Sequence, residues 1–314
     1  MPLEKVFICQ GLLNMSTSPW ATDHAPNTQF APERGVFERP AETFAFDPRA
    51  IGWILDDPAN PLNRIARLIP EGAVVLDVGA GNGILARLLQ VMGKSVEIDA
   101  VEPDPVAQAA AASYYRTIFP GGLEAYIESC QGREVRYDFI VMADVIEHMV
   151  NPEPVLRHLK SLLSAGGSVV LSTPNVAFAS VRIALLNGSF DYVDSGILER
   201  THLRFYTLKT LKHLFFAAGL HPSAQFHCLR NPLTSEISLD VFPLTPWMLG
   251  KIANDELSRV YQFLFVLRSE PCEITVREDL GTVGRYLPIV YVARRASRAI
   301  RKLFRQARAL AAKQ

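Results

Sequence analysis

Glycines and carboxylates gather between residues 74 and 103 in a pattern that could bind a nucleoside. The run Asp77–Gly83 has the sequence D-V-G-A-G-N-G and leads from an apolar segment into a helix-like one. Glycines allow positive φ angles and let the backbone approach a ligand, and the N–H groups at a helix start attract anionic groups. Glu102 follows 25 residues after Asp77. A carboxylate there can accept hydrogen bonds from both hydroxyls of a ribose.

The spacing of these glycines distinguishes between cofactor classes. A dinucleotide-binding G-x-G-x-x-G fingerprint would require glycine at position 84, which is Ile84. The pattern here is D-x-G-x-G-x-G, with Asp77 two residues before the first glycine. A carboxylate at that position suits a ligand that carries an ammonium group better than it suits a pyrophosphate. A nicotinamide oxidoreductase and a glycine turn with no ligand stay as alternatives, opposed by Ile84 and Glu102 respectively.

Apolar runs and helical periodicities alternate through the middle of the chain. Continuous apolar runs predict buried parallel strands, and apolar residues at spacings of three and four predict helices. This alternation predicts right-handed βαβ units, and therefore an α/β fold with a doubly wound, mostly parallel sheet. The predicted strands are 73–78, 96–101, one within 121–136, 137–145, 167–172, 224–229 and 261–267; the predicted helices are one or two within 48–69, then 84–92, 105–118, 153–163, 176–186 and 208–218.

From Val74 to Leu267 the chain resembles the class I S-adenosylmethionine-dependent methyltransferases. The resemblance rests on Asp77–Gly83, Glu102, Tyr137–His148 and Ser164–Asn175. It implies a seven-stranded sheet that ends in an antiparallel hairpin, with S-adenosylmethionine as cofactor: the glycine turn holds its methionine part and Glu102 its ribose. The predicted cofactor-binding residues are Asp77, Gly79, Ala80, Gly81, Asn82, Gly83, Glu102, Pro103 and Asp144.

The segment Phe190–Thr207 resembles a stretch of bacterial methyltransferases that are associated with glycan and polysaccharide synthesis. A weaker resemblance connects the chain to ubiquinone-pathway O-methyltransferases, and both imply oxygen as the acceptor atom. Enzymes that methylate nucleobase amines carry Asn/Asp-Pro-Pro-Tyr/Phe after the fourth strand, where this chain has Ala143-Asp-Val-Ile. We therefore expect a sugar, glycan-linked or other small-molecule hydroxyl as the acceptor, rather than a nucleic acid.

A hydroxyl is a poor nucleophile unless a base takes its proton, and histidine is well suited to that task at neutral pH. His202 lies in the segment expected to cap the carboxyl edge of the sheet, and His148 follows the fourth predicted strand. Both are predicted catalytic residues, with structural roles in the loop and the pocket floor as alternatives. Arg204 could bind an anionic substrate or pair with Glu199 or Asp194.

Asp144, Glu147 and His148 also have a spacing found in metal sites. In some relatives a Glu-x-x-Glu-His run binds a divalent metal, and some of these add a downstream histidine. Here the first position is Asp144, whose side chain is one methylene shorter. We predict no metal and keep the metal site as the alternative.

The formal net charge is zero, but nine Lys or Arg and no acidic residue lie between Arg285 and Gln314. Arginines from Arg294 to Arg308 fall on one face of a predicted helix. That helix could dock on protein, lie on an anionic membrane surface, or bind nucleic acid, for which no motif is present. The expected division is a loosely ordered lead-in (1–48), the methyltransferase domain (49–270) and this extension (271–314).

Cysteine usage and hydropathy indicate a cytoplasmic protein. The four cysteines are scattered, and no apolar run reaches the roughly 18 residues that span a bilayer. Peripheral membrane contact through the basic helix is compatible with this prediction. The functional alternative to an enzyme is a non-catalytic subunit that binds the cofactor and contacts a partner through that helix. The sequence does not indicate an oligomeric state.

Overall fold

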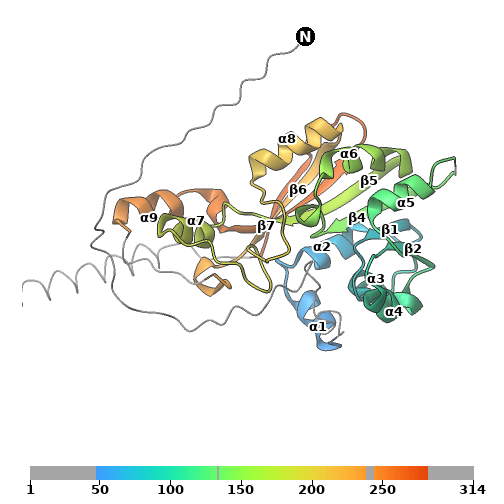
Figure 1. Ribbon diagram of the computed structural model, residues 1–314, viewed down its shortest axis with the longest axis horizontal. Coiled ribbons are helices and arrows are strands. Elements are labelled where there is room, and N and C mark those ends of the chain that lie inside the picture. The colour runs from blue at the N-terminus through green and yellow to red at the C-terminus, as the bar shows by residue number, and fades with distance from the viewer. Residues whose placement is uncertain (1–46, 133, 238–243, 282–314) are drawn as a thin grey trace, which may run out of the picture. The chain divides into compact units, whose positions relative to one another are not determined.

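The computed structural model describes residues 47–132, 134–237 and 244–281. Most of the predicted lead-in (1–48) and the whole predicted basic helix lie outside these residues, so both stay predictions. The described part is organised around one eight-stranded sheet with the strand order β3-β2-β1-β4-β5-β7-β6-β8 (Figure 1). The strands are β1 (Val74–Val78), β2 (Glu97–Val101), β3 (Thr117–Phe119), β4 (Tyr137–Ala143), β5 (Leu163–Pro174), β6 (His221–Leu229), β7 (Val260–Arg268) and β8 (Val276–Leu280).

The sheet is parallel from β3 to β5, and β7 runs antiparallel between β5 and β6. This arrangement confirms the predicted doubly wound sheet with an antiparallel pair. The sheet has eight strands rather than seven, because Val276–Leu280 pairs in parallel with β6. The sheet therefore continues past residue 270, where the sequence analysis placed the end of the domain. The sequence V-R-E-D-L of β8 is largely exposed and shows no apolar alternation that would predict a strand.

Helices cover both faces of the sheet (Figure 1). Two large clusters of buried apolar side chains lie on opposite faces of the sheet, and each includes side chains of the helices that cover that face. Two further helices pack against each other through a small apolar cluster of their own. The first face has α1 (Arg49–Asp56), α2 (Pro61–Leu68), α3 (Ile84–Val91) and α4 (Pro105–Ala111); the second has α5 (Leu123–Ser129), α6 (Pro152–Leu159) and α8 (Leu208–Ala218); the separate pair is α7 (Ala179–Leu186) and α9 (Pro246–Ala253).

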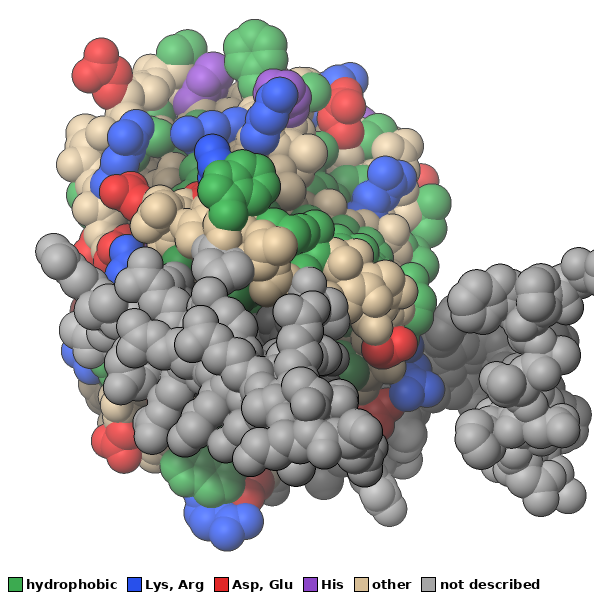
Figure 2. Space-filling view, turned by 90° about the vertical axis from the view of Figure 1, so that its left-hand side faces the viewer, with side chains coloured by type: hydrophobic (Ala, Val, Ile, Leu, Met, Phe, Trp, Pro, Cys, Tyr) green, Lys and Arg blue, Asp and Glu red, His purple; other side chains and the backbone are tan. Residues whose placement is uncertain are grey.

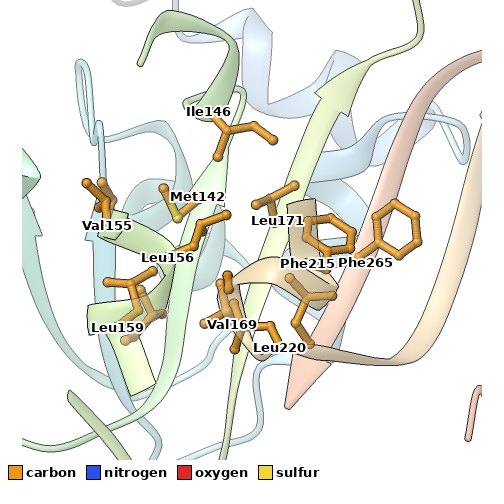
Figure 3. Packing of buried hydrophobic residues seen from close by; sticks show 14 of the residues in the cluster. Met142, Ile146, Val155, Leu156, Leu159, Val169, Leu171, Phe215, Leu220 and Phe265 are labelled. Atoms are coloured by element: carbon orange, nitrogen blue, oxygen red, sulfur yellow. The ribbon is translucent and has the colours of Figure 1, made fainter. Parts of the chain in front are cut away.

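The cluster on the second face fixes the turn that follows β4. Figure 3 shows Ile146 above side chains of α6 and of strands β4 and β5, among them Leu156 and Leu171. Ile146 is fully buried and opens a short 3₁₀ turn, η3 (Ile146–His148). Burying an isoleucine side chain contributes about 1.5–3 kcal/mol, so this residue anchors the turn to the core. The turn carries Glu147 and His148.

The third strand lies before the segment in which it was predicted. The helix expected over 105–118 ends at Ala111, and Thr117–Phe119 pairs with β2. Residues Leu123–Ser129 of that segment form α5 instead. Arg116 stabilises the strand, because its guanidinium binds the Asp99 carboxylate through hydrogen bonds of 3.0 and 2.7 Å. A strand of three residues is too short to show a periodicity, so this placement was not readable from the sequence.

Candidate functional site

The predicted glycine turn lies directly after β1 at the carboxyl edge of the sheet. Gly79, Gly81 and Gly83 have φ angles of +70°, +54° and +80°, which other residues adopt only with strain. A Cβ at Gly79 would also lie 3.0 Å from the Val145 side chain. The turn after β1 therefore touches the turn after β4, and Gly83 caps the start of α3.

Glu102 ties the end of β2 to the glycine turn. Its buried carboxylate accepts hydrogen bonds from the backbone N–H of Gly81 at 2.7 Å and of Asp104 at 2.9 Å. An ionised carboxylate has about four lone-pair sites, so two remain for a ligand. The structure brings the two predicted cofactor segments together. Between them lie Ala80 and Asn82 in the turn, and Pro103 between Glu102 and the Asp104 cap of α4.

Replacing Glu102 with alanine should weaken binding of S-adenosylhomocysteine by at least about tenfold, because hydrogen bonds to a charged group contribute roughly 1.5–3 kcal/mol. Isothermal titration measures the affinity, and circular dichroism checks that the variant folds. Asp104→Ala is the matched control, since it removes the α4 cap but keeps the carboxylate of Glu102. Unchanged affinity in the Glu102 variant would remove the ribose assignment.

Asp77 is buried beneath the glycine turn and accepts a hydrogen bond of 2.6 Å from the hydroxyl of Tyr115. Burial raises the pKa of Asp77 to about 7, and the bond from Tyr115 opposes that shift. Tyr115 was not among the predicted site residues, because it lies in the segment predicted as the end of a helix. No short sequence signal marks it, since the contact spans 38 positions.

Asp144 follows β4 and has a φ of +56°, alone among the described non-glycine residues in the left-handed region. Such a backbone costs of order 1 kcal/mol or more and is typical of functional sites. Its Oδ1 accepts hydrogen bonds from Ser172 Oγ at 2.9 Å and Gln262 Nε2 at 2.6 Å. Desolvation by the surrounding protein raises the pKa of Asp144, although the residue is accessible to solvent through a cavity that it lines.

Glu147 is 1% exposed, and its carboxylate is only partly satisfied. Oε2 accepts a hydrogen bond of 3.0 Å from Thr173 Oγ1, and Oε1 has no hydrogen-bond partner among the described residues. Burial and the nearby charge of Asp144 raise the pKa of Glu147 well above its usual range. The backbone carbonyl of Glu147 accepts hydrogen bonds from the N–H groups of Leu203 and Arg204 at 2.8 and 3.0 Å, which fasten the loop carrying His202.

The structure brings His148 and His202 together, with 4.8 Å between ring centroids. The side chain of His202 is 3% exposed. Its Nδ1 lies 3.0 Å from the Ile197 carbonyl and Nε2 lies 3.6 Å from Glu199 Oε2. A hydrogen bond to a carbonyl makes Nδ1 the donor, so Nε2 carries the lone pair. His148 Nδ1 lies 3.2 Å from the Thr201 carbonyl.

Three side chains of this group could hold a metal ion. Glu147, His148 and His202 each offer a ligand atom, and these atoms lie within 4.8 Å of one another. An unpaired carboxylate oxygen and a histidine fixed through its other nitrogen are features of metal-ligand sets. Arg204 is not part of this group: it donates a hydrogen bond to the Val150 carbonyl. It pairs with neither Glu199 nor Asp194, and Asp194 instead pairs with Arg200.

The geometry defines a methyltransferase-type site, with a glycine turn after β1 and a carboxylate after β2. Residues 53–224 match the family described as methyltransferase domain, and the chain belongs to this family. This membership confirms the predicted methyltransferase class and S-adenosylmethionine as its cofactor. The roles of the individual site residues stay predictions. In the described residues, no helix combines the length and apolar character that crossing a membrane requires.

Two relatives are named ubiquinone biosynthesis O-methyltransferase. The protein from Xanthomonas axonopodis pv. citri is 28% identical over 160 residues, which are 48% of this chain and 66% of the relative, just under two thirds of its length. The protein from Caulobacter vibrioides is 28% identical over 234 residues, or 70% and 90% of the two chains. A solved methyltransferase from Archaeoglobus fulgidus is 16% identical with a TM-score of 0.47, covering 72% of this chain and 96% of that one. None of these names mentions a glycan, so that part of the resemblance is not confirmed.

Proposed function

We propose that this protein transfers a methyl group from S-adenosylmethionine to a hydroxyl of a small molecule. The observation that carries the proposal is the contact between the glycine turn and the turn after β4, where Gly79 meets Val145. This contact supports the proposal because the predicted cofactor turn lies next to the segment that carries Asp144, Glu147 and His148. A site that combines a sulfonium donor with proton acceptors suits methylation of oxygen.

The chemistry is an in-line displacement. The acceptor oxygen forms a bond to the methyl carbon while the bond between that carbon and sulfur breaks, which leaves S-adenosylhomocysteine. Holding the reactants aligned supplies much of the acceleration. The hydroxyl proton passes to a base, and we propose that the paired rings of His148 and His202 provide it. The interaction of Nδ1 with Ile197 sets the orientation of the His202 ring.

A divalent cation is the second candidate for activating the hydroxyl, because Glu147, His148 and His202 fit a ligand set. A bound cation would lower the pKa of a coordinated hydroxyl. The two histidines would then hold the ion together with Glu147, instead of accepting the proton. The two hypotheses differ in their response to chelators and to added metal.

The acceptor class is open between two kinds of hydroxyl. The names of the two relatives support an acceptor of the kind that ubiquinone biosynthesis O-methyltransferases use. The segment Phe190–Thr207 supports a sugar or glycan-linked hydroxyl. Figure 2 shows Lys and Arg interspersed with Asp and Glu on the described part of one face. That mixture supports a small-molecule acceptor, since nucleic-acid sites carry patches of one sign.

Titration of the purified protein with S-adenosylhomocysteine, with NAD as control, tests the cofactor part of the proposal. We expect the first ligand to bind and NAD not to bind. Transfer of a labelled methyl group to catechols and to sugars then tests the acceptor part. If S-adenosylhomocysteine binds but no methyl group is transferred to any hydroxyl, the hypothesis of a non-catalytic subunit is favoured. Binding of NAD alone would overturn the proposal.

A further inference from the structure

The cavity that Asp144 lines lies at the carboxyl edge of the sheet, where the glycine turn also lies. Its volume is about 140 Å³, and it is lined by the start of α2 and by the ends of β4, β6 and β7. β4 and β6 run in the same direction, so their carboxyl ends meet at this edge. Ligands of doubly wound sheets bind at that edge. The polar residues that line the cavity are Asn60, Asp144, Arg230, Tyr261 and Gln262.

Arg230 follows the last residue of β6 and is exposed. Its guanidinium carbon lies 4.4 Å from the centre of the Tyr261 ring. The Tyr261 hydroxyl donates a hydrogen bond of 2.9 Å to Glu236 Oε1, and this bond holds the ring in place. A guanidinium stacked on an aromatic ring keeps its N–H edge available for two parallel hydrogen bonds.

No carboxylate of the described residues forms an ion pair with Arg230, whereas other exposed arginines here do form such pairs. Arg157, for example, pairs with Glu153 at 2.5 Å. A cation that lines a cavity, is stacked on a fixed ring and forms no ion pair with the described residues is suited to an oxyanion from a ligand.

Asp144 supplies the opposite charge in the same cavity. Its carboxylate accepts hydrogen bonds from Ser172 and Gln262. It lies on the β4 side of the cavity, next to Val145, whose side chain the glycine turn approaches. A carboxylate there can accept a hydrogen bond from the hydroxyl that receives the methyl group. The cavity thus presents an acceptor for a hydroxyl on the β4 side and a cation on the β6 side.

We propose that Arg230, held on Tyr261, binds a carboxylate or phosphate of the methyl acceptor. This inference rests on the proposed function, because it concerns the acceptor of the same site. It restricts the acceptor to a hydroxy acid or a phosphorylated alcohol, in which the anionic group and the reacting hydroxyl belong to one molecule. Arg230 is then a specificity-determining residue, and neutral analogues of the acceptor bind weakly.

Matched ligand pairs test this proposal on protein saturated with S-adenosylhomocysteine. The pairs are 3,4-dihydroxybenzoate with its amide, and glucose 1-phosphate with glucose, each measured by isothermal titration. We expect the anionic member of at least one pair to bind at least about tenfold more tightly, the lower end of what a hydrogen bond to a charged group contributes. Which pair shows the difference distinguishes carboxylate from phosphate.

Three variants complete the experiment. Arg230→Gln should abolish the preference for the anion, and Arg230→Lys should keep part of it. Arg277→Gln, an exposed arginine on β8 away from the cavity, should keep all of it. Equal binding of both members, no binding of any anion, or a preference that survives in Arg230→Gln would overturn the proposal. Failure of S-adenosylhomocysteine itself to bind would instead overturn the proposed function.

Discussion

The affinity for S-adenosylhomocysteine should rise about tenfold for each pH unit between roughly pH 5.5 and 7, and then level off. The reason is Asp77, whose pKa burial raises to about 7. Below that pH the carboxyl is neutral, and it must lose its proton before it can pair with the ligand's ammonium group. Each unit below the pKa costs about 1.36 kcal/mol, which is a factor of ten in affinity.

Two variants isolate this effect from other groups that titrate nearby. Asp77→Asn should remove most of the slope and bind weakly at every pH. Tyr115→Phe should move the midpoint upward, because the Tyr115 hydroxyl holds the pKa of Asp77 down. Titrations in buffers of different ionisation enthalpy should show proton release on binding at pH 6. A pH-independent affinity in the unmodified protein would contradict the role of Asp77.

The ligand-free protein should respond to pH in the opposite direction. The pKa of Asp77 is raised in the folded protein above its unfolded value of 3.8. Its contribution to stability is therefore fully present below about pH 4 and is lost as the pH rises through about 7. Thermal melts should show that Asp77→Asn reduces this loss. The cofactor would then bind best where the empty site is least stable.

The sequence allowed prediction of the parts of the site that depend on local spacing. The glycine turn and Glu102 were found because positive φ angles require glycine and because one strand and one helix separate the two segments. The contact between Glu102 and Gly81 confirms that these segments meet. The class of fold followed from the alternation of apolar runs in the same way.

The contacts that complete the site join residues far apart in the chain, and local patterns do not encode them. Gln262 binds Asp144 across 118 positions, and Ser172 does so across 28. The pairing of His148 with His202 depends on two hydrogen bonds to the Glu147 carbonyl, which no side-chain pattern indicates. The histidines were therefore predicted one by one, and the structure shows them as one group.

Replacing His202 with glutamine should lower methyl transfer by about 100-fold or more, because groups that move protons contribute about 10²–10⁴ to a rate. The affinity for S-adenosylhomocysteine should stay nearly unchanged, since His202 is not among the predicted cofactor-binding residues. His148→Gln should act in the same direction. Glu153→Gln is the control, because this half-exposed residue on α6 pairs with Arg157 on the same helix and is not one of the predicted site residues. Full turnover in both histidine variants would exclude this pair as the base.

The stability of a Glu147→Gln variant separates the two hypotheses for activating the hydroxyl. Burial raises the pKa of Glu147 in the folded protein above that of the unfolded chain. The contribution of its protonated form to stability is therefore present at low pH and is lost as the pH rises through the raised pKa. In the presence of a chelator at pH 8, Glu147→Gln should therefore melt several degrees higher than the unmodified protein. If the group binds a metal, added Mg²⁺ or Mn²⁺ should raise the melting temperature of the unmodified protein and not that of the variant. If the histidines act alone, neither metal nor chelator should change melting or turnover, and only the variant's gain in stability should remain.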